Sequence, residues 1–185
     1  MGVVGPLTIT PELREEIETK IVAPTVRQLQ GGGLLYRGVI YIGLMITPNG
    51  PTVIEYNVRF GDPETQVIMP LLDGDWGQVF FQLGKGELLP LRWKSLHLAC
   101  VVMAADGYPD APVKGTPIEG DLGYQSDSSY FLHAGTQRKD GKWLVNGGRV
   151  LNAVGMGSTL KEAISKAYAQ AKHAPWKGQR MRKDI

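Results

Sequence analysis

A proline-bearing stretch, Leu88-Leu89-Pro90-Leu91, divides the sequence into two parts of different character. Before it, helical patterns alternate with a pair of extended runs. After it, extended runs dominate and one strong helical pattern covers Thr159 to His173. Helices and strands mixed along one chain are typical of α/β and α+β folds. The sequence therefore predicts an α/β (α+β) protein with a first domain over residues 1–90 and a small β-rich domain with one packed helix over residues 91–185.

A long helix with an interruption is predicted near the start of the sequence. Thr10 precedes Pro11, and acidic residues follow from Glu12, which is the pattern of a capped helix with proline at its first position. Pro24 lacks a backbone N–H, so it must kink or restart the helix. Gly31-Gly32-Gly33 is expected to end it.

A hairpin and two short helices complete the first part. Pro48-Asn49-Gly50-Pro51 is a turn cluster between two β-branched and aromatic runs, Tyr36–Thr47 and Thr52–Val58. Asp62 is expected to cap a helix that has Pro63 at its first position, and a further helix is expected at Trp76–Leu83.

The second part is predicted to be mostly strands. Extended runs cover His97–Ala105, Tyr130–Gln137, Trp143–Asn146 and Arg149–Val154. Asp140-Gly141 is a hairpin turn signal, and Thr159 and Glu162 form a capping box for the one strong helix. We expect the core of this part to contain Cys100, Val102, Leu132, Val150, Ile164 and Tyr168.

The composition excludes several classes of protein. A formal net charge of +2 argues against binding nucleic acid through bulk electrostatics. The longest apolar run, Leu96 to Ala105, is too short for a bilayer, which needs about 20 residues. The single cysteine, Cys100, lies inside that run and is expected to be a buried thiol in a reducing, cytoplasmic setting.

The stretch from Glu55 to Arg59 has the most informative chemistry. Side chains alternate between the two faces of a strand, so Glu55, Asn57 and Arg59 are expected to share one face. A carboxylate and an amide oxygen two residues apart offer hard oxygen ligands that suit Mg²⁺, and a guanidinium next in line suits phosphate. The same alternation is also typical of any half-solvated strand, so both interpretations stay open.

The segment from Glu55 to Gln66 resembles the signature segment of the phosphoribosylamine–glycine ligase (glycinamide ribonucleotide synthetase) family of ATP-grasp enzymes. Arg37–Met45 resembles the strand that precedes that signature. Five further segments match in order: Gly107-Tyr108-Pro109, Lys114-Gly115, His133-Ala134-Gly135-Thr136, Gly147-Gly148-Arg149-Val150-Leu151 and Arg182-Lys183-Asp184-Ile185. The resemblance thus covers nearly the whole chain.

The resemblance implies an enzyme that condenses glycine with 5-phosphoribosylamine and splits ATP to ADP and phosphate, with Mg²⁺ (or Mn²⁺) bridging the phosphates. Glu55 and Asn57 match the magnesium ligands of the family. Arg59 would lie where an acyl phosphate of glycine forms and would stabilise its charge. Asp62 and Glu64 are candidates for orienting the amine substrate, and helix capping by Asp62 is the alternative.

The family has an N-terminal substrate domain and an ATP-binding lid before this region, and the sequence holds neither. Its first residues, Met1–Pro6, resemble the segment after the lid, where the family usually reads Met-Gly-Ala-Tyr-Ser-Pro. We therefore expect the closing half of an ATP-grasp domain followed by the C-terminal domain of the ligase, inactive in isolation and prone to self-associate, from a monomeric parent. The alternatives are a related ATP-grasp ligase or carboxylase and a non-catalytic binding or regulatory module.

Overall fold

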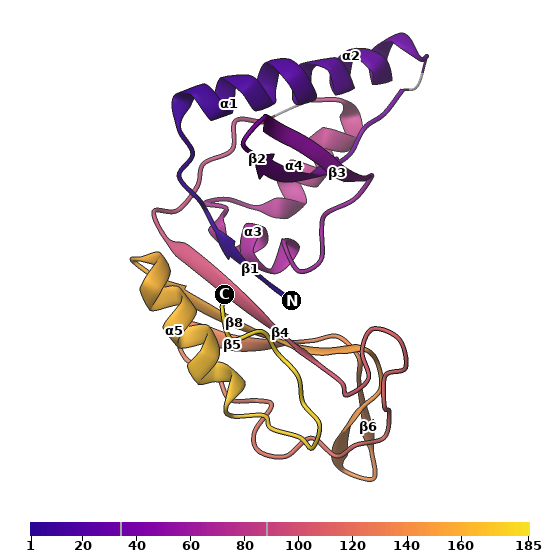
Figure 1. Cartoon of the computed structure of the whole chain (residues 1–185), viewed down its shortest axis with the longest axis vertical. Helices are drawn as coiled ribbons and strands as arrows, with labels where there is room; N and C mark the ends of the chain where they lie inside the picture. Colours follow the sequence, from indigo (N-terminus) through magenta and orange to yellow (C-terminus); the bar gives the residue numbers. More distant parts are fainter. Residues whose placement is uncertain (34, 88) are drawn as a thin grey trace. The chain divides into compact units, whose positions relative to one another are not determined.

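The computed structural model describes residues 1–33, 35–87 and 89–185. The chain forms two compact units: unit 1 comprises Met1–Pro6, Asp62–Asp73 and Arg92–Ile185, and unit 2 comprises Leu7–Gly61 and Gly74–Leu91. The mixture of helices and strands confirms the α/β (α+β) class (Figure 1). The division into residues 1–90 and 91–185 stays a prediction, and Leu88 of the proposed boundary lies outside the described residues. No helix in the described part of the chain is long and apolar enough to cross a membrane.

Unit 1 is built on a four-stranded antiparallel sheet in the order β1-β4-β8-β5 (Figure 1). Its strands are β1 (Gly2–Gly5), β4 (His97–Ala104), β5 (Ser129–His133) and β8 (Arg149–Gly157). The two central strands, β4 and β8, are buried on both faces, which explains why they read as continuous apolar runs. Strand β1 was not predicted from the sequence. All four of its residues pair with β4.

The two faces of β4 pack against different helices. Leu98 and Cys100 lie in one apolar cluster with Val67 and Leu71 of α3 (Thr65–Leu71). The alternate residues pack against α5 (Leu160–Ala171), in a cluster of Ala99, Val101, Ala163 and Ala167. The single helix predicted in the second part is therefore confirmed, and α3, which precedes the sheet's long strands in the sequence, covers the opposite face.

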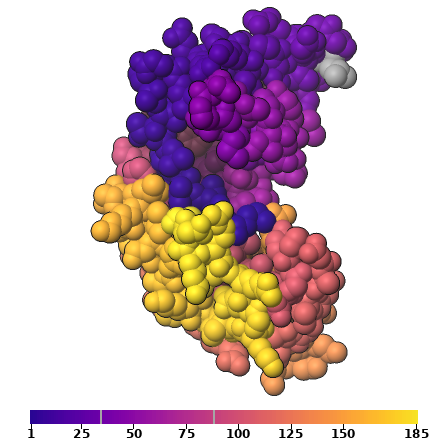
Figure 2. All heavy atoms as spheres, in the orientation of Figure 1, coloured from indigo at the N-terminus to yellow at the C-terminus, as the bar shows by residue number. Residues whose placement is uncertain are grey.

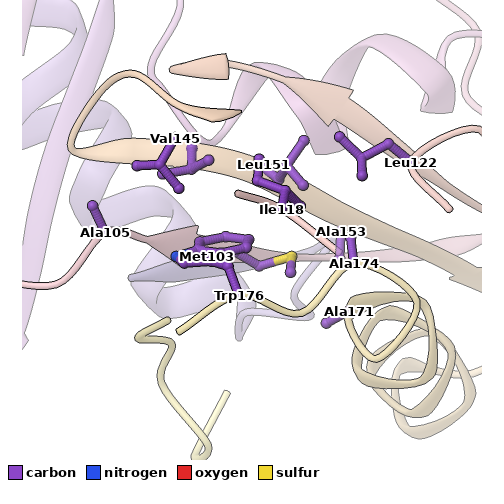
Figure 3. Packing of buried hydrophobic residues seen from close by; sticks show 11 residues of the cluster. Met103, Ala105, Ile118, Leu122, Val145, Leu151, Ala153, Ala171, Ala174 and Trp176 are labelled. Carbon is purple, nitrogen blue, oxygen red and sulfur yellow. The ribbon is translucent and has the colours of Figure 1, made fainter. Parts of the chain in front are cut away.

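A third apolar cluster fills the far end of unit 1 (Figure 3). Met103, Leu151 and Val145 are almost fully buried there, and Trp176 closes over them from the C-terminal segment. The expected core positions of Cys100, Val102 and Val150 are confirmed by exposed fractions of at most 1%. The expected core position of Leu132 is wrong, because it lies on the edge strand β5 and is 37% exposed.

The run expected to be one strand from Tyr130 to Gln137 is two strands, β5 and β6 (Thr136–Lys139). The strand is interrupted at Ala134 and Gly135. The N–H of Gly135 donates to the carbonyl of Arg149 at 2.8 Å. A side chain could not fit here, because a Cβ on Gly135 would come within 2.6 Å of the Gly147 Cα. β6 continues into β7 (Lys142–Val145) through the predicted turn at Asp140-Gly141, where φ is 49° and 77°.

Helix α5 begins at Leu160 and is capped as predicted by Thr159, whose Oγ1 accepts a hydrogen bond from the Glu162 N–H at 3.2 Å. The returning contact of the capping box goes one residue further, since Glu162 Oε2 accepts from the N–H of Ser158 at 2.8 Å. Beside it, Ile185 at the C-terminus and Val4 of β1 pack against the α5 cluster. Figure 2 shows these yellow C-terminal residues beside the indigo N-terminal ones.

Unit 2 contains the interrupted helix, a two-stranded hairpin and one more helix (Figure 1). Its elements are α1 (Pro11–Ile17), the π-helical turn η1 (Glu18–Val22), α2 (Ala23–Gly31), β2 (Tyr41–Thr47), β3 (Gly50–Asn57) and α4 (Trp76–Lys85). Thr10 caps α1 by accepting from the Leu13 N–H at 3.2 Å, as predicted. The expected disturbance at Pro24 takes the form of η1, which ends just before it.

Unit 2 has little core of its own. Among its described residues, Ile21 is the only apolar side chain that is buried. Ile40, Ile42 and Leu44, on β2 and directly before it, are half-buried. The most exposed apolar side chains of β3 and its end are instead Ile54 at 62% and Val58 at 76%.

Candidate functional site

Glu55 and Asn57 lie on one face of the hairpin β2–β3. Asn57 pairs with Tyr41 and Glu55 pairs with Gly43, with regular pairing between them. Both positions therefore keep the strand's alternation and project to the same side. A bulge follows at once, because Leu44 pairs with Val53 and leaves Ile54 as the extra residue.

Gly43 makes room for the side chain of Glu55. A Cβ at this position would lie 3.1 Å from the Glu55 Cγ and 3.5 Å from the ring of Tyr41. Both side chains thus fold over the bare backbone of Gly43, and any larger residue would push at least one of them aside. The glycine in the strand therefore has a local steric reason, which the sequence pattern alone did not reveal.

The pair of oxygen donors fits a hard divalent cation. Glu55 is exposed and Asn57 is half-buried, so a carboxylate and an amide oxygen are available on the same face. Within the described residues, no group of three or more His, Cys, Asp or Glu side chains is placed to hold a metal. A cation at this pair would take its remaining ligands from water or phosphate, as Mg²⁺ commonly does.

Arg59 follows the end of β3 and is exposed. Its Nη1 donates to the carbonyl of Phe60 at 2.7 Å, which uses one of about five guanidinium donors. The ring of Phe60 in turn packs edge-on against Trp76, with centroids 5.8 Å apart, and against Phe80 at 6.1 Å. This aromatic cluster from α4 anchors the backbone beside Arg59, while the rest of the guanidinium has capacity for an anion.

Asp62 and Glu64 belong to unit 1, whereas Glu55, Asn57 and Arg59 belong to unit 2. The helix predicted to start at Asp62 starts later, since α3 begins at Thr65 with Glu64 at its N-cap position. The expectation that Asp62 caps this helix is therefore wrong. The reason is a turn over residues 62–64 that separates it from the first helical N–H groups.

The side chain of Asp62 is engaged inside unit 1. Its Oδ1 accepts from Gln66 Nε2 at 2.8 Å, and its Oδ2 pairs with Arg149 Nη2 at 3.3 Å. The carbonyl of Asp62 accepts from Arg149 Nη1 at 2.9 Å. Arg149 is part of one of the family segments, but no sequence pattern indicates its contact with Asp62, because the two residues lie far apart along the chain.

Cys100 of β4 is fully buried and its thiol is unreactive at neutral pH. Burial raises the pKa of its thiol to about 12, and the carboxylates of Asp62 and Glu64 push it in the same direction. A thiol that stays protonated at neutral pH is a poor nucleophile and metal ligand. The prediction of a buried core thiol is confirmed.

The other face of the hairpin has an open apolar groove that the sequence did not predict. Its volume is about 440 Å³, and its lining includes Pro24, Leu29, Tyr36, Ile40, Tyr56 and Val58. The sequence feature that could have predicted the groove is the apolar side of the alternation along β3, which includes Tyr56 and Val58. Tyr56 meets α2 directly, since its hydroxyl lies 3.0 Å from Thr25 Oγ1.

His133 of β5 contacts the β6–β7 hairpin. Its Nδ1 lies 2.8 Å from Thr136 Oγ1, and its ring centroid is 4.6 Å from that of Trp143. These contacts tie β5 to the β6–β7 hairpin.

Two family models match consecutive parts of the chain. The model described as phosphoribosylglycinamide synthetase, ATP-grasp (A) domain, matches residues 1–65, and the model of the C domain matches residues 98–185. The phosphoribosylamine–glycine ligase of Caulobacter vibrioides is 41% identical over 97% of this chain and 43% of its own length. That of Caldanaerobacter subterraneus is 42% identical over 100% of this chain and 45% of its own length. The chain thus spans less than half of these relatives.

Solved structures give the same picture. The crystal structure of phosphoribosylamine–glycine ligase from Thermotoga maritima matches with a TM-score of 0.86 and 38% identity, over 100% of this chain and 46% of that one. The biotin carboxylase domain of 2-oxoglutarate carboxylase from Hydrogenobacter thermophilus matches with a TM-score of 0.68 at 17% identity, over 97% of this chain and 40% of that one. The second likeness concerns the fold alone.

Proposed function

The chain belongs to the phosphoribosylglycinamide synthetase family, and from that premise we propose that it forms the later part of an ATP-dependent ligase that joins glycine to 5-phosphoribosylamine. The main support is the position of Glu55 and Asn57 on one face of β3, inside the segment that matches the ATP-grasp domain. The products would be glycinamide ribonucleotide, ADP and phosphate, in purine biosynthesis.

Glu55 and Asn57 would hold Mg²⁺, or Mn²⁺ in its place. Such an ion neutralises charge on the phosphates of a bound nucleotide during phosphoryl transfer. The pair suits this role because two protein oxygens leave the other ligand positions to phosphate and water. Gly43 supports the arrangement by leaving space for the Glu55 side chain.

Arg59 would stabilise negative charge on an acyl phosphate of glycine. Its anchored backbone and exposed guanidinium support this role, since a preorganised cation need not be reoriented during the reaction. Glu64 is the proposed residue for orienting the amine substrate. Asp62 stays a candidate for the same task, although its contacts with Gln66 and Arg149 favour a different one.

The chain alone would be inactive, because the residues that grip the nucleotide belong to the part of the ligase that it does not span. Glycine, 5-phosphoribosylamine and ATP would be the substrates of the complete enzyme, which we expect to be monomeric and cytoplasmic. Glycine- and phosphoribosylamine-dependent release of ADP from the purified chain tests this proposal. Turnover near that of an intact ligase would contradict it.

The roles of Glu55 and Asn57 are tested in the full-length ligase that contains this segment. Glu55→Ala should raise the Mg²⁺ concentration needed for half-maximal activity by at least about tenfold, and Asn57→Ala should raise it less, because a neutral amide is the weaker ligand. Glu12→Ala, on the exposed first turn of α1, is the matched control and should change nothing. An unchanged magnesium requirement in Glu55→Ala would mean that this face of β3 is merely solvated.

A further inference from the structure

Arg149 makes a two-point contact with the turn at residues 62–64. One guanidinium nitrogen donates to the Asp62 carbonyl at 2.9 Å, and the other lies 3.3 Å from the Asp62 carboxylate. Contact to both backbone and side chain fixes position and orientation together, which a single point charge would not do. The two residues are 87 positions apart in the sequence.

The backbone of Arg149 is itself firmly held. The carbonyl of Arg149 accepts from Gly135 N, and the carbonyl of Gly148 accepts from Ala105 N, both at 2.8 Å. Gly148 lies against the ring of Tyr108, where an added Cβ would come within 2.4 Å of a ring carbon. Arg149 therefore projects from a rigid strand end, which is what a precise support requires.

The pair has little to contribute to overall stability. The side chains of Arg149 and Asp62 are 35% and 46% exposed, and ion pairs exposed to this degree contribute little to overall stability. Gln66 takes the remaining carboxylate oxygen of Asp62 at 2.8 Å. The carboxylate oxygens of Asp62 are thus both engaged within the protein.

We infer that Arg149 is a positioning residue that holds the turn at residues 62–64, with Asp62 as its handle, and so sets the location of Glu64. The inference rests on the proposed function, in which Glu64 orients the amine substrate. Loss of Arg149 would then weaken recognition of 5-phosphoribosylamine and leave recognition of ATP unchanged. Asp62 would act through the turn rather than by touching substrate.

The structural half of the inference is tested on this chain by hydrogen exchange of the peptide that covers residues 58–66. Arg149→Ala should speed exchange there about tenfold, the factor for one lost charge-assisted hydrogen bond. Asp62→Ala should speed exchange less, because it leaves the backbone carbonyl that Arg149 also contacts, and the double variant should fall clearly short of the sum of the two single effects. Arg180→Ala is the matched control, because Arg180 pairs with Asp106 at 2.6 Å in the same unit. Additive effects, or unchanged exchange in Arg149→Ala, would overturn the inference.

The functional half is tested in the full-length ligase. Arg149→Ala should raise the KM for 5-phosphoribosylamine about tenfold with the KM for ATP within about twofold, and Arg149→Lys should recover part of the loss. Equal changes in both KM values would mean a general structural defect and would overturn the inference. If the full-length protein has no ligase activity, the proposed function fails instead, and the exchange experiment still decides whether Arg149 holds the turn.

Discussion

Unit 1 and unit 2 differ sharply in how they bury apolar residues. Unit 1 covers both faces of its sheet, and its three apolar clusters include side chains with no exposed surface. The described residues of unit 2 form a two-stranded hairpin and an open groove, and one apolar side chain among them is buried. A two-stranded sheet is marginally stable without further strands or a packed helix. The difference indicates that unit 1 can fold from its own residues, whereas unit 2 depends on additional contacts.

The proposed metal ligands lie in the unit with the smaller core. Glu55 and Asn57 occupy a hairpin whose other face is the open groove beside Tyr56 and Val58. If the chain is part of a longer ligase, the remaining part would be the natural cover for this apolar surface. Catalytic geometry in unit 2 would then form only in the complete enzyme.

Limited proteolysis should separate the two units most clearly. Unit 2 should be cut on the order of a thousandfold faster than unit 1, because cleavage follows local opening and its core is minimal. The first cuts are expected at Gly31–Gly33 and in the connector from Gly84 to Leu91. Mass spectrometry of timed digests gives the sites and rates.

The exposed turn at Asp140-Gly141 in unit 1 is the internal control, since it should be cut slowly despite its exposure. Segment 62–73 should stay bound to the resistant C-terminal piece after cleavage on both sides, and separate only in denaturant. Equal resistance along the chain in a strictly monomeric sample would show that both units share one core.

Core truncations should act on separate unfolding transitions. Leu151→Ala should cost unit 1 about 3 kcal/mol, because the side chain is fully buried and leaves a cavity. Ile21→Ala should cost unit 2 only about 1 kcal/mol, since a loosely packed site can collapse around the change. Urea unfolding followed by tryptophan fluorescence measures both. A single transition moved by both substitutions would contradict the comparison.

Alkaline pH should weaken unit 1 in particular. Burial raises the pKa of Cys100 from 9.0 to about 12, so the unfolded chain loses this proton first as pH rises. The contribution of the Cys100 thiol to the free energy of unfolding is therefore fully present below pH 9. It falls as the pH rises from about 9 to 12, and the loss is about 1.4 kcal/mol at pH 10. Cys100→Ala should show a smaller loss between pH 8 and 10, measured by thermal unfolding. An identical loss in both proteins would mean that the thiol is not the cause.

Local patterns predicted the individual elements well. The cap at Thr10, the hairpin around Gly50 and the turn at Asp140-Gly141 all follow from neighbouring residues. The shared face of Glu55 and Asn57 also follows from the period of a strand. These features depend on interactions within a few residues, which the sequence displays directly.

The errors concern interactions between distant residues. The sequence around Asp62 predicts a helix cap. In the structure α3 begins at Thr65, and the Asp62 carboxylate pairs with Arg149, far along the chain. Leu132 looks like core until its strand is placed at the edge of the sheet. The apolar run in β1 consists of two valines, which is too short to predict a strand. The segment is a strand because it pairs with β4. None of these contacts leaves a periodic trace in the sequence.

The pairing of β1 with β4 has a consequence for synthesis on the ribosome. Gly2 pairs with Val101, so the first strand must wait for a partner that is made much later. At roughly 5 to 20 residues per second, the delay is about 5 to 20 seconds. During that time the whole of unit 2, Leu7–Gly61 and Gly74–Leu91, is synthesised between the two strands. β1 therefore stays without its hydrogen-bonding partner until β4 has been made.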